Sequence, residues 1–195
     1  MAAVRIDPIR LSGPWSDGYV LERQHTLSSD FIGHDSNGNP QFDTKRSELV
    51  YRLKNRSDRK ALAHIAEAAV EFIKGWAPKV DTIVPLPPSR KRAYQPVVEI
   101  AKGIGTRLQR PVAETGVNKV KETPELKDVY DYEQRIKLLD RAFEVNANAV
   151  RDKRILLVDD LYRSGATATL VAKALLAASA KTVCMLAMTR TRTRT

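Results

Sequence analysis

The sequence predicts an α/β fold, in which a mostly parallel β-sheet is flanked by helices and a small β-rich appendage lies at the N-terminus. From residue 57 onward, segments with apolar residues at helical spacing alternate with short apolar segments typical of strands. The apolar run Ile155–Val158 is uninterrupted, which indicates a strand buried on both faces, as in a parallel sheet. Before residue 56, glycine, asparagine and proline punctuate short apolar runs, which favours short strands and tight turns.

We predict that residues 1–56 form this appendage, or hood. Its segment Asp35–Pro40 contains an Asn-Gly pair, which is the strongest short-range signal for a hairpin turn. The segment Ser47–Arg56 carries apolar residues along one side and predicts a short helix. The sequence therefore places a hairpin and a helix before the main domain.

Residues 57–188 are predicted to form the α/β core. Apolar residues recur at helical spacing in three segments, Leu62–Trp76, Val97–Leu108 and Leu170–Ala178. The expected strands are Val80–Leu86, Val117–Val120, Ala142–Val145, Arg154–Val158 and Thr182–Met188. The first helix is expected to start at Ser57-Asp58, because serine and aspartate are preferred N-cap residues. Residues 121–139 are polar and charged without a firm period, and residues 189–195 form a basic tail of alternating Thr and Arg.

The charge of the chain favours partners that carry negative charge. The 195 residues give a formal net charge of +10 at pH 7, and the excess remains positive when the arginines of the tail are left out. Phosphorylated metabolites, nucleic acid and a membrane surface would each fit such a charge. Charge alone does not choose among them.

The single cysteine, Cys184, limits the chemistry that the chain can perform. One cysteine excludes an internal disulfide and a zinc site built from cysteines. Cys184 lies in an apolar run, so we expect a buried, inert thiol. No apolar run approaches the ~20 residues that span a bilayer, and the first ten residues lack the apolar stretch of a signal peptide. These observations predict a cytoplasmic protein.

The most informative stretch is Val158–Thr167. A buried strand leads into two adjacent carboxylates, Asp159 and Asp160, and a short turn with Ser, Gly and Thr precedes a helix start. Adjacent acids at a strand end can accept hydrogen bonds from two hydroxyls of one ribose, or from one hydroxyl and a metal-bound water. The turn Arg163–Thr167 offers backbone N–H groups, hydroxyls and a helix N-terminus, which together suit a phosphate.

Alternative interpretations of this stretch are less favoured. An isolated pair of aspartates would most simply end a strand and cap the next turn, but the complete pattern favours a ligand site. A response-regulator receiver also places acids after a strand, but too few residues follow Asp160 to complete such a domain. The Gly-x-x-x-x-Gly-Lys-Ser/Thr and Gly-x-Gly-x-x-Gly patterns of other nucleotide-binding loops are absent.

This stretch resembles the phosphoribosyl-pyrophosphate (PRPP) signature of type I phosphoribosyltransferases, which is a hydrophobic run, two acids, two variable residues and Thr-Thr-Gly-x-Thr. Within that superfamily the chain is most similar to the competence-protein ComF group, and the similarity covers residues 80–188. Further segments resemble that group in the same order, namely Ile83–Pro87 with Ser89–Arg92, Lys121–Pro124, Gln134-Arg135 and Arg141–Phe143.

The chain departs from the family at three points. Arg163 and Ser164 replace the usual Thr-Thr, and Arg92–Gln95 matches poorly the Arg-Gly-Phe-Asn-Gln that follows the first loop. The N-terminal zinc module of many relatives is missing, and residues 15–55 stand in its place.

The resemblance implies a role for each matching residue. Asp159 and Asp160 would hold the ribose 2- and 3-hydroxyls and, indirectly, the cofactor Mg²⁺. The 5-phosphate would be held by Arg163, Ser164, Gly165, Ala166 and Thr167. The pyrophosphate loop would comprise Pro87, Pro88, Ser89, Arg90 and Lys91. Residues 121–139 would form a mobile flap, with phosphate contacts from Lys119, Lys121, Lys127 and Arg135.

The sequence leaves several functions open. The leading hypothesis is a Mg²⁺-dependent phosphoribosyltransferase that moves ribose 5-phosphate between PRPP and a nitrogenous acceptor. A second is a non-catalytic sensor of PRPP or a nucleotide, associated with DNA processing or competence. Direct nucleic-acid binding through the basic tail would be weak and unspecific, because no aromatic platform accompanies the charge. The acceptor is open, with His25, Ser28 and Ser29 of the hood as candidates for its recognition, and a homodimer is compatible with the sequence.

Overall fold

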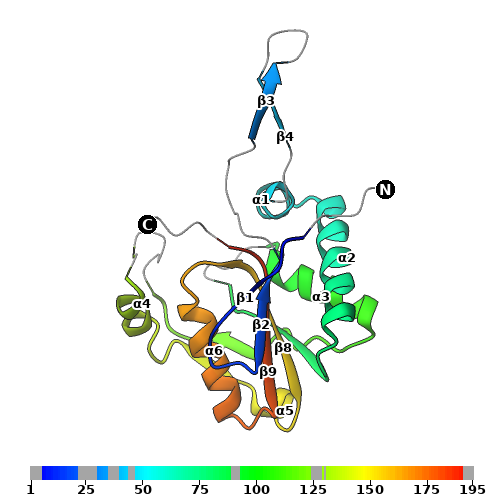
Figure 1. Ribbon diagram of the computed structural model, residues 1–195. Helices are drawn as coiled ribbons and strands as arrows, with labels where there is room; N and C mark the ends of the chain where they lie inside the picture. Colours follow the sequence, from blue (N-terminus) through cyan, green and yellow to red (C-terminus); the bar gives the residue numbers. More distant parts are fainter. Residues whose placement is uncertain are drawn as a thin grey trace.

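The computed structural model describes residues 6–21, 30–34, 40–43, 47–88, 93–123, 129 and 131–190. Its centre is a five-stranded sheet in the order β1-β2-β9-β8-β5 (Figure 1). The strands are β1 (Ile9–Arg10), β2 (Asp17–Val20), β5 (Thr82–Pro85), β8 (Arg154–Tyr162) and β9 (Thr182–Arg190). The edge strand β1 is antiparallel to β2, and the other neighbours are parallel. The predicted α/β fold with a mostly parallel sheet is therefore confirmed.

Helices cover both faces of this sheet (Figure 1). One core cluster joins Leu156 and Val158 of β8 to α1 (Ser47–Arg56), α2 (Arg59–Trp76) and α3 (Pro96–Leu108). The alternate residues Ile155 and Leu157 pack with α6 (Ala166–Ala177) and the short helix α5 (Ala147–Val150) on the other face. Because successive strand residues point to opposite faces, an uninterrupted apolar run is what a strand between two helix layers requires.

Local signals explain the position of α2. Asp58 adopts an extended conformation and its side chain accepts hydrogen bonds from the N–H groups of Lys60 and Ala61, as predicted for an N-cap. The helix ends at Ala77, which is in the left-handed conformation. The carboxylate of Asp58 also accepts a hydrogen bond from Nε of Arg52, at 2.9 Å. This contact ties the end of α1 to the start of α2.

The strands β8 and β9 extend further than the sequence predicted. β8 continues through Asp159 and Asp160 to Tyr162, because its last residues pair with β9. β9 in turn reaches Arg190, and Thr189 is fully buried. The boundary that the sequence placed between the core and the basic tail at residue 189 is corrected, since Thr189 and Arg190 belong to the sheet. The rest of the tail, 191–195, lies outside the described residues.

The N-terminal segment also differs from the single appendage that was predicted. β1 and β2 belong to the central sheet, because β2 pairs with β9, which is the last strand of the described chain. The strands β3 (Asp30–His34) and β4 (Pro40–Asp43) form a separate antiparallel pair that extends beyond α1 (Figure 1). The predicted hairpin therefore has its two strands, while residues 35–39 lie outside the described part of the chain.

A small unit lies beside the main sheet. β6 (Val117–Lys119) and β7 (Phe143–Val145) form an antiparallel pair, and α4 (Tyr132–Leu138) lies between them in sequence. The side chain of Asp131 caps α4 by accepting a hydrogen bond from the N–H of Gln134, at 2.7 Å. Leu139 and Ala142 pack against Ala166 at the start of α6. Part of the predicted flap is thus a short helix seated on the core.

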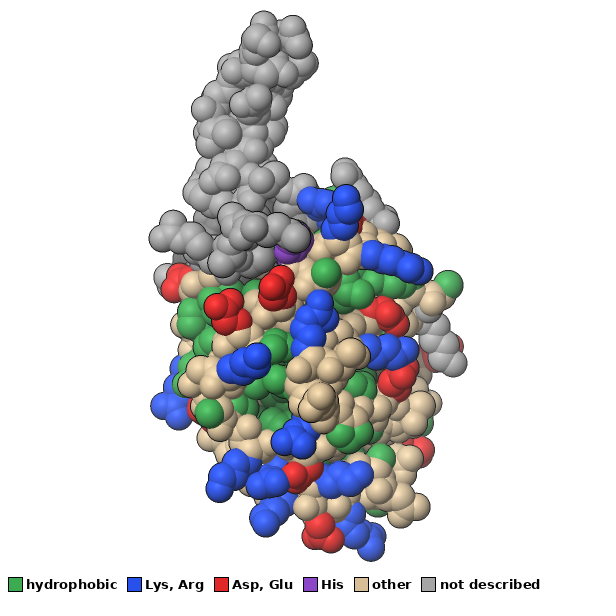
Figure 2. Space-filling model, turned by 90° about the vertical axis from the view of Figure 1, so that its right-hand side faces the viewer, with side chains coloured by type: hydrophobic (Ala, Val, Ile, Leu, Met, Phe, Trp, Pro, Cys, Tyr) green, Lys and Arg blue, Asp and Glu red, His purple; other side chains and the backbone are tan. Residues whose placement is uncertain are grey.

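The described surface carries charges of both signs. On the face that holds α2 and α3, Lys and Arg side chains are spread out with Asp and Glu among them (Figure 2). Cys184 is buried, as predicted, and burial raises the pKa of its thiol. Among the helices that the structure describes, none has the length and apolar character needed to cross a membrane.

Candidate functional site

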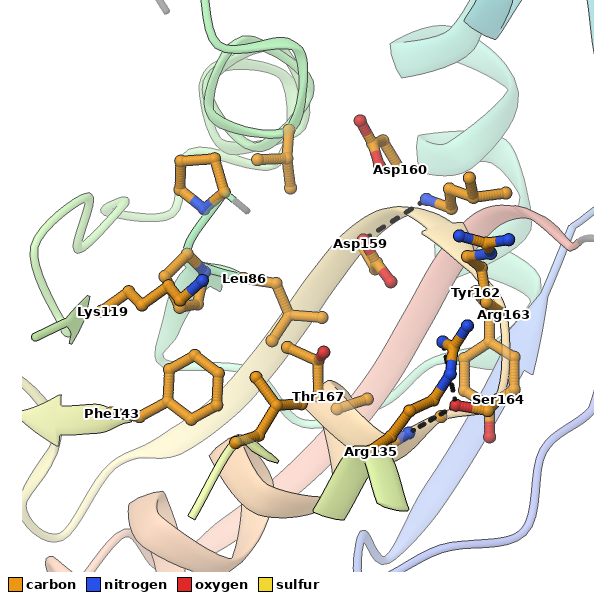
Figure 3. Close-up of a pocket in the computed structure, with 18 of the residues that line it drawn as sticks. Leu86, Lys119, Arg135, Phe143, Asp159, Asp160, Tyr162, Arg163, Ser164 and Thr167 are labelled. Atoms are coloured by element: carbon orange, nitrogen blue, oxygen red, sulfur yellow. Dashed lines mark hydrogen bonds between the residues drawn. The ribbon is translucent and has the colours of Figure 1, made fainter. Parts of the chain in front are cut away.

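A cavity of about 410 Å³ opens at the carboxyl ends of β5 and β8 (Figure 3). Ligands of parallel α/β sheets bind outside this end of the strands. Its walls come from α1, the segment after β5, the start of α3, the β6–β7 unit with α4, and the β8–α6 connection. The N–H of Leu86 donates to the carbonyl of Val158 at 2.8 Å, which holds the segment after β5 against β8. Segments distant in sequence therefore meet around one cavity.

Asp159 and Asp160 both line the cavity, on the last part of β8. By the alternation of a strand, Asp159 lies on the side of α6 and Asp160 on the side of α1 to α3. Oδ1 of Asp159 accepts a hydrogen bond from the N–H of Leu161 at 3.3 Å. Nζ of Lys54 lies 3.0 Å from Oδ1 of Asp160. The two carboxylates thus have different surroundings although they are neighbours.

These surroundings change the acidity of Asp159. Burial and the adjacent charge of Asp160 raise the pKa of Asp159 to about 7, while the charge of Lys54 and the hydrogen bond from Leu161 act in the opposite direction. Burial disfavours a charged carboxylate, and a like charge nearby adds to that effect. Near neutral pH this carboxyl group can therefore accept or donate a proton in a hydrogen bond.

The turn between β8 and α6 has the geometry of an anion site. Gly165 takes the N-cap position of α6 with φ of 79°, a left-handed conformation that favours glycine. The helix begins at Ala166, so Ala166 and Thr167 belong to its first turn and not to the loop that the sequence predicted. The first N–H groups of a helix lack intrahelical acceptors and attract negative charge. Oγ of Ser164 accepts a hydrogen bond from the N–H of Ala166, at 3.4 Å.

Cationic side chains face this turn. Arg135 of α4 is only 6% exposed, and its Nη1 donates to Oγ of Ser164 at 3.3 Å (Figure 3). Its Nε donates to the carbonyl of Val129. Burial and the nearby charge of Arg163 lower the pKa of Arg135. Two arginines therefore lie close together beside a helix N-terminus, an arrangement that an anion would stabilise.

Lys119 approaches the cavity from β6. Its Nζ donates to Oγ1 of Thr123 at 2.6 Å, and burial lowers its pKa. Thr123, Phe143 and Leu139 lie in the same wall of the cavity. The wall opposite the acids is therefore partly apolar, and Lys119 brings a partly buried cation to it.

The structure brings together most of the site residues that the sequence predicted. The predicted residues that line the cavity are Pro87, Pro88, Lys119, Arg135, Asp159, Asp160, Arg163, Ser164, Gly165, Ala166 and Thr167. Lys121 does not line it; Lys121 is exposed, and its Nζ donates to the carbonyl of Asp140. Outside the described residues lie Ser89, Arg90, Lys91 and Lys127, and also His25, Ser28 and Ser29.

Sequence reasoning gave no site role to several further lining residues, among them Lys54, Gln95, Phe143 and Tyr162. Lys54 lies in a helix that carried no chemical signal, and only the fold brings it to the acids. Gln95 occupies the N-cap of α3 without capping it through its side chain. Tyr162 stands inside the stretch Val158–Thr167 that the sequence singled out, and this position is the signal that could have found it. In the structure, an added Cβ on Gly165 would come within 2.1 Å of the Tyr162 hydroxyl.

The site has oxygen ligands for a divalent cation, but few of them. Asp159 and Asp160 supply carboxylate oxygens, which Mg²⁺ prefers, and Mg²⁺ is commonly held by one or two carboxylates together with substrate phosphates and waters. Within the described ranges, no group of three or more His, Cys, Asp or Glu side chains could enclose a metal. The donor set therefore fits a cation that shares its ligands with a phosphorylated substrate.

No protein-family model matches the chain, and no curated protein matches it. Solved structures that resemble it include glutamine PRPP amidotransferase from B. subtilis complexed with ADP and GMP, at 17% identity and a TM-score of 0.46. This match covers 65% of the present chain but only 26% of the amidotransferase, so the chain spans about a quarter of that protein's length.

Adenine phosphoribosyltransferase from Thermoanaerobacter pseudethanolicus is similar at 17% identity and a TM-score of 0.45, over 69% of the present chain and 83% of that chain. Purine phosphoribosyltransferase from Pyrococcus horikoshii is similar at 16% identity and a TM-score of 0.39, over 66% and 80%. At these low similarities, the function of the present chain has to be inferred from the residues of its own cavity.

Proposed function

We propose that this chain binds PRPP in the cavity at the end of β8 and transfers its ribose 5-phosphate to or from a nitrogenous acceptor. One observation carries the proposal. Two adjacent carboxylates, a glycine-containing turn at a helix N-terminus and a buried arginine meet in a single cavity of about 410 Å³. A ligand with a diol at one end and a phosphate at the other satisfies these groups together.

The ends of the ligand can be assigned to residues. The 5-phosphate would lie at the segment Arg163–Thr167, which comprises the turn and the first residues of α6, because backbone N–H groups and the helix dipole there favour an anion. Arg135 would add charge there, since it already donates to Ser164. The ribose 2- and 3-hydroxyls would donate to Asp159 and Asp160, which lie next to this turn on β8.

The same residues would lower the barrier to transfer. The bond between C1 of the ribose and the pyrophosphate oxygen breaks, a bond from C1 to the acceptor nitrogen forms, and pyrophosphate leaves. Positive charge develops on the ribose ring, and carboxylates placed beneath it would stabilise that charge. Lys119, Pro87 and Pro88, which line the cavity, would face the leaving pyrophosphate. Closure of the segment that contains α4 would exclude water, which would otherwise hydrolyse PRPP.

Mg²⁺ is part of this proposal. The carboxylates of Asp159 and Asp160 would reach it indirectly, through water and the substrate oxygens. When bound, Mg²⁺ would neutralise part of the negative charge of the pyrophosphate. The order of the segments that resemble the ComF group supports membership of that group, and the cytoplasm supplies both PRPP and Mg²⁺.

Binding of PRPP is the first test. Addition of PRPP with Mg²⁺ is expected to raise the melting temperature of the wild type, because a ligand that binds only the folded state stabilises it. The variant Asp160→Asn is expected to keep its own melting temperature and to lose the shift. Asp140→Asn, at a side chain that is 70% exposed outside the cavity, is the matched control and should respond like the wild type. Absence of a shift for the wild type at millimolar PRPP would contradict the proposal.

A second candidate function, a non-catalytic sensor of PRPP or a nucleotide, is favoured by one observation. Tyr94, in the poorly matched segment on the pyrophosphate side, packs against the core cluster that contains residues of α2 and α3, and it does not line the cavity. Its hydroxyl is buried and has no hydrogen-bond partner among the described residues. Release of pyrophosphate from PRPP in the presence of a panel of nucleobases supports the transferase, whereas binding without release supports the sensor.

A further inference from the structure

Helix α1 places one side chain, Lys54, in the wall of the cavity. Nζ of Lys54 lies 3.0 Å from Oδ1 of Asp160, and the two side chains are only 22% and 16% exposed. Exposed ion pairs contribute little because water screens them and both side chains lose conformational freedom. A pair that is largely removed from water, inside a cavity, has a stronger effect on the orientation of its carboxylate.

The position of α1 is itself fixed by packing. Leu53, next to Lys54 in the sequence, is fully buried, and Val50 one turn earlier is nearly so. Both pack with α2 and with strands β8 and β9 in one core cluster. Arg52 holds the N-cap carboxylate of α2 from the same helical turn. The backbone that carries Lys54 is therefore anchored on two sides, and the lysine reaches Asp160 from a defined point.

The strand geometry explains why Lys54 meets Asp160. Side chains of β8 alternate between the two faces, and Asp160 follows Leu156 and Val158 on the face that packs against α1 to α3. Figure 3 shows Asp160 on one side of the cavity and Ser164 with Arg135 on another. The ammonium group of Lys54 consequently acts on the end of the cavity that we assign to the ribose hydroxyls. The segment that we assign to the 5-phosphate lies at another side.

We propose that Lys54 is the positioning residue of the acid pair: it holds the carboxylate of Asp160 in the orientation that accepts a hydrogen bond from a sugar hydroxyl, and it reduces the repulsion between the two neighbouring carboxylates. This inference rests on the proposed function, because it takes a ribose 5-phosphate as the ligand. It gives the N-terminal segment a part in recognition of the sugar, exerted through Asp160. Lys54 acts through Asp160, so its loss weakens sugar binding while phosphate binding persists.

The experiment compares two probes by calorimetry, ribose 5-phosphate and inorganic phosphate, on purified full-length chain. Lys54→Met removes the charge and keeps the length of the side chain, and Lys54→Arg restores the charge. Lys60→Met, at an exposed lysine in the first turn of α2, is the control for net charge. Lys54→Met is expected to weaken ribose 5-phosphate binding about tenfold, the loss typical of one charge-assisted hydrogen bond. Its phosphate affinity should stay near that of the wild type.

Two comparisons give the test its specificity. Lys54→Arg should recover most of the affinity for ribose 5-phosphate, and Lys60→Met should bind both probes like the wild type. In an Asp160→Asn background, Lys54→Met should cause a clearly smaller loss than in the wild type, because the carboxylate that lies 3.0 Å from the lysine is then gone. Circular dichroism and melting curves establish that each variant is folded, and Lys54→Gln replaces Lys54→Met if the latter is unstable.

The outcomes separate this inference from the proposed function. A wild type that binds phosphate but gains nothing from the ribose contradicts the proposed function and the role of Lys54 together. A wild type that prefers ribose 5-phosphate, with Lys54→Met equal to it, overturns only the role of Lys54. Equal losses for both probes in Lys54→Met would show a general electrostatic effect and would also overturn it.

Discussion

Gly165 carries the backbone of the proposed phosphate turn. Its φ of 79° lies in the left-handed region, and a Cβ there would come within 2.1 Å of the hydroxyl of Tyr162 and 2.6 Å of its ring. Gly165→Ala should therefore lower the free energy of unfolding by about 1–3 kcal/mol, the usual strain of such a backbone. It should also weaken the binding of inorganic phosphate, since the turn has to shift. Denaturant unfolding and calorimetry measure the two effects.

Gly75 provides the matched control for this substitution. It lies in α2 and is exposed, and nothing lies within 4 Å of an added Cβ. Gly75→Ala should be neutral or stabilise the protein by up to about 1 kcal/mol, because alanine favours a helix. Equal stability of Gly165→Ala and the wild type would show that the turn does not depend on glycine.

The residues of the site differ in how well a sequence can reveal them. Asp159, Asp160 and Gly165 stand in one continuous stretch whose order of acid, turn and helix start has a direct chemical interpretation. Arg135 was predicted only through a resemblance, and its contact with Ser164 depends on how α4 packs. Lys54 could not be predicted, because its approach to Asp160 depends on the packing of α1 against the sheet.

Between elements, an ion pair joins the starts of β5 and β8. Oδ2 of Asp81 accepts hydrogen bonds from the backbone N–H of Arg154 at 2.8 Å and from its Nε at 2.9 Å. The guanidinium of Arg154 holds the pKa of Asp81 well below its usual range. Because the folded state favours the ionised carboxylate, this contribution to stability is complete above the unfolded pKa of about 3.9 and is lost as the pH falls through the folded value.

Asp81→Asn should therefore be less stable than the wild type at neutral pH, and the difference should shrink when the pH falls below about 4. Urea unfolding at a series of pH values measures it. Glu67→Gln, at an exposed carboxylate of α2, controls for the change of charge. A difference between Asp81→Asn and the wild type that is the same at pH 7 and pH 3 would contradict this account.

Elements with strong local signals were predicted, and those that depend on distant partners were not. α2 has an N-cap aspartate, apolar residues at helical spacing and a clear end, all within its own sequence. β2 is four residues long and half-buried, and only its pairing with β9 makes it part of the sheet. The extension of β9 to Arg190 likewise needs the end of β8 as a partner, which a polar Thr-Arg sequence does not indicate.

For the molecule as a whole, the sheet is buried on two faces. Leu156 and Leu157 are neighbours in β8, both fully buried, and they belong to different core clusters. Leu156→Ala and Leu157→Ala should each lower the free energy of unfolding by about 2–5 kcal/mol, because each leaves a cavity in a packed layer. Leu176→Ala, at a leucine of α6 that is 38% exposed, should cost much less. Denaturant unfolding measures all three, and a small loss for either β8 variant would contradict two-sided burial.

The pairing of β2 with β9 has a consequence for biosynthesis. β2 is synthesised before β5, β8 and β9, although its parallel partner in the sheet is β9. Until translation reaches β9, β8 can pair with β5 on one edge only, and β2 has no partner that joins it to β8. Pairing between strands that are far apart in sequence forms slowly. The nascent chain therefore has to remain soluble until β9 has been made and can join β2 to β8.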